Sequence, residues 1–241
     1  MKIKNFIAEF GKTVLELLKC SSRKVVKHWI IFFIVFPIAT IIGVYVIYPY
    51  DARTSDSFSQ VKKEHRSRYD LMKKVSKFGD FGGVAAACVL LVAAGKLCGK
   101  RRLAMAGLAG ILAASAAGLL NDVLKLSGRP RPDARIENHL EDKLYGPKLN
   151  DHHWFDSHYQ SFASGHTTTA FGAAAGVSLT CPPLAVPAFA CASVVAFSRV
   201  YLMAHYPTDV FVGGMIGIWF GLAFAMAARD LSKSSGTNTT I

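Results

Sequence analysis

The apolar residues of this 241-residue chain gather into long blocks that contain no charged side chain. A helix needs about 20 residues to cross the hydrocarbon core of a bilayer. The block 29–48 has that length, and the pair Pro182-Pro183 divides the longest apolar stretch into two. The pattern predicts an all-α protein, a six-transmembrane-helix bundle with its spans in the blocks 29–48, 81–94, 103–120, 167–187, 187–197 and 210–228.

Residues 1–28 precede the first span and alternate apolar and basic positions. Apolar side chains recur there at helical spacing, at Ile3, Ile7, Phe10, Val14 and Leu17. This predicts an N-terminal amphipathic helix on the membrane surface, and an ordinary helix packed on the bundle is the alternative. The first apolar block is too long for the core of a cleaved signal peptide, so we expect it to stay in the membrane.

Two polar segments complete the organisation of the chain. The stretch of about residues 49–80 is rich in Lys and Arg, and it is either a solvated loop or a basic helix that attracts anionic lipid headgroups. The polar tail 229–241 is expected to be disordered. Residues 29–228 are therefore expected to form one six-span domain. Within its last span, Gly213, Gly217 and Gly221 repeat every four residues, which favours close helix packing.

Charge and cysteine content set the compartment and the expected cofactors. The formal net charge is +12, and Lys and Arg are dense in the N-terminal segment and between Lys96 and Arg102. The positive-inside rule then places both termini in the cytoplasm and the loops after the third and fifth spans outside. The five cysteines show no CxxC spacing. We expect no disulfide, no metal and no other cofactor.

Candidate chemistry begins with Ser198-Arg199, His205 and Asp209, between the last two spans. A carboxylate four residues after a histidine is well placed to accept its Nδ1 proton, which leaves the Nε2 lone pair free as a nucleophile. The guanidinium of Arg199 has the planar donor geometry that suits a phosphate. The combination predicts phosphoryl chemistry at a membrane surface.

Two further polar blocks lie at span ends on the same face of the predicted bundle. Lys125 and the run 128–132, Gly-Arg-Pro-Arg-Pro, follow the third span and leave basic side chains at its outer end. Ser164-Gly165-His166 opens the fourth span, where free backbone N–H groups of a helix N-terminus attract anions. In a chain that alternates direction, all three blocks reach one pocket.

This ordered set of blocks resembles the type 2 phosphatidic acid phosphatase (PAP2) superfamily, over roughly residues 81 to 228. The resemblance implies metal-independent hydrolysis through a phosphohistidine. It implies that His205 is the nucleophile, Asp209 its orienting partner and His166 the general acid. It further implies that the phosphate is held by Lys125, Arg131, Ser164, Gly165 and Arg199.

Two positions depart from the pattern of this family. The family usually places six residues between the lysine and Arg-Pro, whereas five separate Lys125 from Arg131. One residue turns a helix by about 100°, so the direction of the Lys125 side chain is in question. Ala163 stands where the family commonly has proline.

The function expected by resemblance is a membrane phosphatase acting on a lipid phosphate monoester or diphosphate, with the site on the periplasmic or extracellular face of a bacterial inner membrane. Candidate substrates are phosphatidylglycerol phosphate, undecaprenyl diphosphate, phosphatidic acid and lipid A phosphate. A lipid phosphotransferase with the same site is the close alternative, and a non-enzymatic anion transporter is the alternative from another class. We expect the lipid bilayer as a partner, and we expect no nucleic-acid partner.

Overall fold

The computed structural model describes residues 2–146 and 156–234, and over these residues the chain is helical with no β-strand. Four helical segments there are long and apolar enough to cross a membrane, or five if the helix pair bent by 54° at residues 78–81 is one span. The chain is thus a multi-pass membrane protein. Its bundle consists of α2 (Phe36–Ile47), α5 (Phe81–Leu97), α6 (Arg101–Leu124), α8 (Gly165–Thr180), α9 (Ala185–Tyr201) and α10 (Pro207–Ser234).

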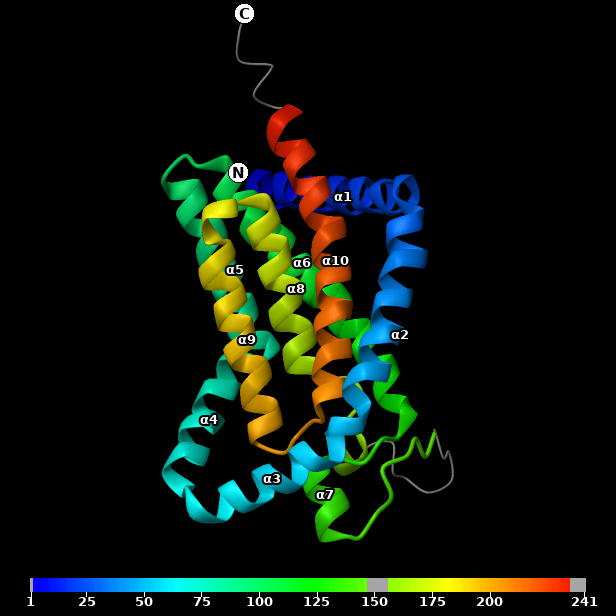
Figure 1. The fold of residues 1–241 in the computed structure, drawn as a ribbon. Coiled ribbons are helices and arrows are strands. Elements are labelled where there is room, and N and C mark those ends of the chain that lie inside the picture. Colours follow the sequence, from blue (N-terminus) through cyan, green and yellow to red (C-terminus); the bar gives the residue numbers. More distant parts are fainter. Residues whose placement is uncertain (1, 147–155, 235–241) are drawn as a thin grey trace, which may run out of the picture.

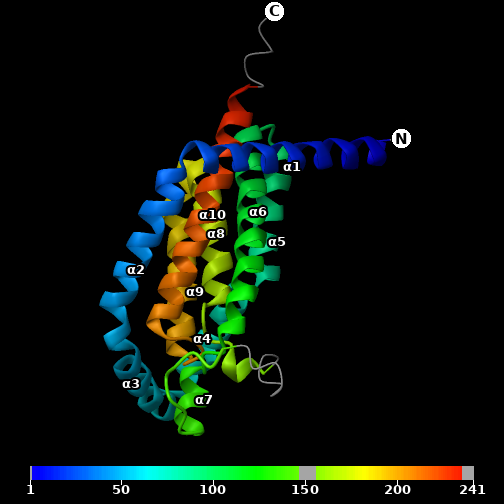
Figure 2. The ribbon, with the colours of Figure 1, turned by 90° about the vertical axis from the view of Figure 1, so that its right-hand side faces the viewer.

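Further helices cover the two ends of this bundle (Figure 1). At one end, α1 (Lys2–Lys27) runs across the bundle axis, as the turned view in Figure 2 also shows. Lys24 of α1 forms an ion pair there with Asp230 near the end of α10. The opposite end carries α3 (Asp51–Glu64), α4 (Arg66–Phe78) and α7 (Pro132–Glu137).

The centre of the bundle is α8, which packs against α6, α9 and α10. Small residues permit this close approach. A Cβ atom on Gly217 of α10 would lie 2.5 Å from the carbonyl oxygen of Thr168, and one on Gly176 would lie 2.9 Å from that of Ala109. The glycine repeat in α10 is therefore a packing feature, as its spacing predicts.

Each predicted apolar block corresponds to one helix of the bundle, but the boundary expected at residue 187 lies inside α9, and the polar segments differ from the prediction. Helix α8 ends at Thr180 and α9 begins at Ala185, so the chain reverses at the two prolines as expected. Residues 49–80 are not an open loop, because they form α3 and α4. The part of the tail up to Ser234 continues α10 and is not irregular. Residues 235–241, also assigned to the disordered tail, lie outside the described residues.

Candidate active site

The three polar blocks meet at the end of the bundle opposite α1 (Figure 1). The first block begins where α6 ends, in a short 3₁₀ turn at Lys125–Ser127. Gly128 follows with φ of +67°, a conformation that side chains disfavour, and a Cβ atom on it would lie 2.8 Å from the carbonyl oxygen of Gly146. Glycine at this position therefore turns the chain away from the helix axis and into the loop that carries the arginines.

Residues 129–131 are not helical, and α7 begins only at Pro132, because a residue that precedes proline disfavours the helical conformation. Their backbone is fixed by two hydrogen bonds. The N–H of Ser161 donates to the Arg129 carbonyl oxygen at 3.0 Å, and the N–H of Arg131 donates to that of His158 at 2.7 Å. Arg129 and Arg131 nevertheless have different surroundings, because Arg129 is buried in an ion cluster and Arg131 lines a cavity.

Arg129 is buried and joins three carboxylates from distant parts of the chain. Its Nη1 donates to Asp209 Oδ1 at 2.7 Å and to Thr208 Oγ1 at 2.9 Å. Its Nη2 donates to Asp51 at 2.9 Å, and Nε and Nη2 hold the two oxygens of Asp142 at 2.9 and 2.8 Å. Asp51 and Asp209 are almost fully buried. Such charges are stable in the interior only when they are paired and hydrogen-bonded.

Asp209 does not contact the ring of His205 in the way the sequence predicted. The Nδ1 atom of His205 lies 2.7 Å from the carbonyl oxygen of Ser161. Asp209 Oδ2 instead accepts hydrogen bonds from the Ser161 hydroxyl at 2.5 Å and from the Tyr206 N–H at 2.9 Å. The expected direct bond is therefore wrong, because the carboxylate is occupied by the loop that carries the carbonyl acceptor. The tautomer is the expected one, since a carbonyl oxygen only accepts and Nδ1 must hold the proton.

His205 lies in the loop before α10 and is only 3% exposed. Burial, and then the positive charges of Arg199 and Arg131, hold its pKa well below the usual 6.5. The ring is therefore neutral at physiological pH, with the Nε2 lone pair available. This is the protonation state that a nucleophile requires.

Arg131 and Arg199 line a cavity of about 300 Å³ together with His166. Arg199 donates from Nη1 to the hydroxyl of Ser76 at 2.6 Å. The Nε atoms of both arginines are buried and have no hydrogen-bond partner within the described residues. Buried donors are normally satisfied, so two arginines that line one cavity and each retain an unsatisfied N–H group indicate an anion site.

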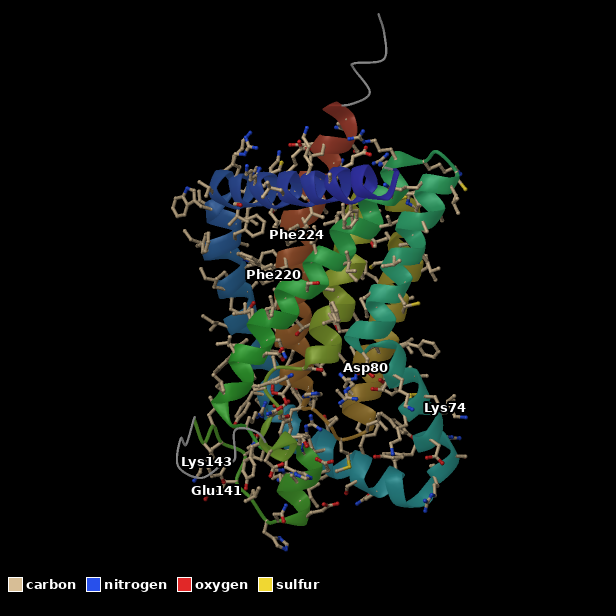
Figure 3. The ribbon with its side chains drawn as sticks, turned by 180° about the vertical axis from the view of Figure 1, so that it is seen from behind. Lys74, Asp80, Glu141, Lys143, Phe220 and Phe224 are labelled. Atoms are coloured by element: carbon tan, nitrogen blue, oxygen red, sulfur yellow. The ribbon has the colours of Figure 1, made fainter. Side chains whose placement is uncertain are left out.

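His166 lies at the start of α8, and its Nε2 is 2.5 Å from Asp80 Oδ1. Asp80 precedes α5 and is labelled in Figure 3, at the site end of the bundle. Both residues also line a second cavity, of about 460 Å³, whose wall includes Phe81 and Leu119. The general acid expected from the sequence therefore stands between a cationic cavity and a more apolar one.

Lys125 reaches this second cavity despite its shortened spacing. Its Nζ pairs with Asp122 at 2.6 Å and lies 3.8 Å from the point where a Cβ atom on Gly165 would be. Ser164 is placed differently, since it lines neither cavity. It is fully buried, and its hydroxyl lies 3.0 Å from that of Thr167. Lys125 and Gly165 therefore line the second cavity with His166, whereas Arg131 and Arg199 line the first.

Several residues of the site escaped prediction from sequence. Ser161, Arg129 and Asp51 carry the loop that holds His205, and Asp80 and Ser76 contact the charged residues directly. The sequence pointed to Arg129 in one way only, because this residue belongs to the first of two consecutive Arg-Pro pairs. The others gave none, because their partners lie far away in the sequence.

Comparison with known proteins identifies the family. The profile of the PAP2 superfamily matches residues 103–232, more than half of the chain. The chain belongs to the PAP2 superfamily.

Curated relatives of this PAP2 chain include two proteins named lipid A 1-phosphatase. The protein from Rhizobium johnstonii is 39% identical over 112 residues, which cover 45% of this chain and 42% of the relative. The protein from Rhizobium etli is also 39% identical over 112 residues, covering 45% of this chain and 44% of the relative. The chain thus matches less than half the length of these relatives.

A solved structure shares the fold of the PAP2 chain. It is the crystal structure of a transmembrane PAP2-type phosphatidylglycerolphosphate phosphatase from Bacillus subtilis. The TM-score is 0.56 at 21% sequence identity, and the alignment covers 88% of this chain and 96% of that one. At this identity the match supports the helical arrangement alone.

Replacing Arg129 by methionine tests the buried charge cluster. The substitution keeps an apolar stem but leaves Asp51 and Asp209 buried without their cation, so we expect a loss of stability of about 3–5 kcal/mol. Thermal unfolding of the purified protein in detergent measures it. Lys143→Gln is the matched control, because Lys143 pairs with Glu141 at the exposed edge of the same loop (Figure 3). Equal stability of both variants would contradict the role of Arg129.

Proposed function

We propose that this PAP2 protein is an integral membrane phosphatase that hydrolyses a lipid phosphate monoester or diphosphate through a phosphohistidine at His205. The observation that carries the proposal is the neutral, buried imidazole of His205 beside two arginines with unsatisfied N–H groups. A neutral nucleophile and a cationic anion site are the two parts that phosphoryl transfer requires.

In the first step, Nε2 of His205 attacks phosphorus while the bond from phosphorus to the leaving oxygen breaks. Arg131, Arg199, Lys125 and the Gly165 amide balance the charge on the phosphoryl oxygens. His166 gives its proton to the leaving oxygen, so the lipid departs as an alcohol or as a lipid phosphate. Because the Ser164 hydroxyl already has a partner, we assign Ser164 to holding the first turn of α8.

In the second step, water attacks the phosphohistidine. His166, now neutral, accepts a proton from this water, and the bond between phosphorus and Nε2 breaks. Inorganic phosphate leaves and His205 returns to its neutral form. Asp209 acts through Ser161 in both steps, since it fixes the carbonyl that holds Nδ1.

A lipid substrate is supported by the surroundings of His166. The cavity on its α5 and α6 side is walled by Phe81 and Leu119, which are exposed apolar residues at the outer surface of the bundle. An acyl or prenyl chain would leave the site along this wall, with the phosphate among the arginines. The relatives named lipid A 1-phosphatase are consistent with this substrate class.

The same proposal includes six membrane crossings, by α2, α5, α6, α8, α9 and α10, in a catalytic domain of residues 29–228. An even number is supported by the position of α1 and the end of α10 at one end of the bundle, where Arg101 donates to the Leu231 carbonyl oxygen at 3.3 Å. We place this basic end in the cytoplasm, with α1 as an amphipathic helix on the membrane surface. The site then faces the periplasm or the exterior of a bacterial inner membrane.

Replacing His205 by alanine removes the nucleophile. We expect phosphate release from a panel of lipid phosphates to fall by about 10⁴-fold or more, with the protein still folded. The assay uses purified protein in detergent, and His28→Ala, at the opposite end of the bundle, is the control with unchanged activity. Undiminished release by His205→Ala would refute the enzymatic reading.

The pH dependence of kcat/KM separates the two histidines. Since the pKa of His205 is lowered, its ring stays neutral as the pH falls through 6.5, and the acid limb lies well below that value. His166 must be protonated to act as the acid, so activity falls at alkaline pH. Steady-state assays across the pH range test both limbs. An acid limb centred at 6.5, or a profile that is flat from about pH 5 to 8, would contradict these roles.

A further inference from the structure

Helix α4 presents one face to the cationic cavity. Tyr69, Lys73, Ser76 and Lys77 line it, and their spacing of three and four residues places them on one side of the helix. Lys74 does not line the cavity, and Figure 3 shows its side chain directed outward from the bundle. The basic segment between the first two spans is thus divided into lysines that face the site and lysines that do not.

Helix α4 is held in a fixed register against the site. The hydroxyl of Ser76 accepts the hydrogen bond from Arg199 at 2.6 Å, and Ser76 is buried. One turn later, the carbonyl oxygen of Gly79 accepts from the Thr169 hydroxyl of α8 at 3.2 Å. A helix anchored to both α8 and α9 keeps the backbone of Lys73 and Lys77 in a constant position relative to the arginines.

The charges around the cavity exceed those of one phosphate. Lys73, Lys77, Arg131 and Arg199 line it, and Asp133 and Asp80 are the facing acids. Asp80 is matched by His166 at 2.5 Å when the latter is protonated. With His166 protonated, as the proposed general acid requires, Asp133 offsets one of the four cations and three positive charges remain. A phosphate monoester brings nearly two negative charges.

The excess charge lies on α4. Among the described residues none of these four cations forms an ion pair, but Arg131 and Arg199 act on His205 and the two lysines do not. We propose that Lys73 and Lys77 bind a second phosphate group in the headgroup of the substrate, next to the phosphoryl group that is transferred. The proposal rests on the proposed function and makes a lipid with two adjacent phosphates, such as a diphosphate, the preferred substrate class.

For a diphosphate, His205 Nε2 forms a bond to the terminal phosphorus and the bond to the bridging oxygen breaks. His166 protonates that oxygen, and the departing lipid monophosphate lies beside Lys73 and Lys77. The lysines then stabilise the leaving group as well as the bound substrate. General attraction of α4 to an anionic bilayer is a different role, and it would involve Lys74 equally.

The test compares two substrates with the same tail, farnesyl monophosphate and farnesyl diphosphate, hydrolysed by the full-length protein in neutral detergent. The readout is the ratio of kcat/KM for the diphosphate to kcat/KM for the monophosphate. We expect this ratio to fall by about tenfold or more in the double variant Lys73→Gln/Lys77→Gln, because charged hydrogen bonds to the second phosphate are lost. Lys74→Gln keeps the wild-type ratio, and Lys73→Arg/Lys77→Arg largely restores it.

Because both rates come from one preparation, partial misfolding of a variant cancels in the ratio. An unchanged ratio in the double glutamine variant would overturn the second phosphate subsite and leave the phosphatase intact. An equal fall in Lys74→Gln would do the same and favour general attraction to anions. A wild-type protein that hydrolyses neither substrate would overturn the proposed function, and the subsite with it.

Discussion

The site depends on the ion cluster around Arg129. Asp51 at the start of α3, Asp142 in the loop after α7 and Asp209 in the first turn of α10 all bind this guanidinium. Asp51 and Asp209 would not be stable in the interior alone, so their burial requires the arginine. The aromatic ring of Tyr206, whose centroid lies 4.0 Å from Cζ of Arg129, completes the cluster. The cluster therefore joins α3, the loop after α7 and α10, which are separate elements of the chain.

The reacting groups derive their positions from this cluster in two steps. Asp209 binds the Ser161 hydroxyl, and the Ser161 carbonyl oxygen holds Nδ1 of His205. Arg131, two residues after Arg129, lines the cavity with Arg199. The Arg-Pro-Arg-Pro run therefore places Arg129 in the buried cluster and Arg131 at the cavity that we propose for phosphate. The close packing of α8 on α10 brings His166 to the same place.

The sequence predicted the parts of this protein that depend on local pattern. Uncharged blocks marked the apolar helices, Pro182-Pro183 marked the turn between α8 and α9, and the three polar blocks reach one end of the bundle as expected. Contacts between distant residues were beyond such patterns. The acceptor for His205 is a backbone carbonyl, which has no sequence signature, and Asp51 lies 78 residues from Arg129. Helices α3 and α4 were obscured by their charge, because they pack through few apolar positions.

The central claim is that Nε2 of His205 becomes covalently phosphorylated. Rapid quenching of the enzyme with a lipid phosphate labelled in its terminal phosphoryl group tests it, followed by peptide mapping under alkaline conditions that preserve phosphohistidine. The account predicts transient label on His205 in the wild-type protein, stable to alkali and lost in acid. Label on another residue, or rapid turnover with no labelled protein at any quench time, would contradict it.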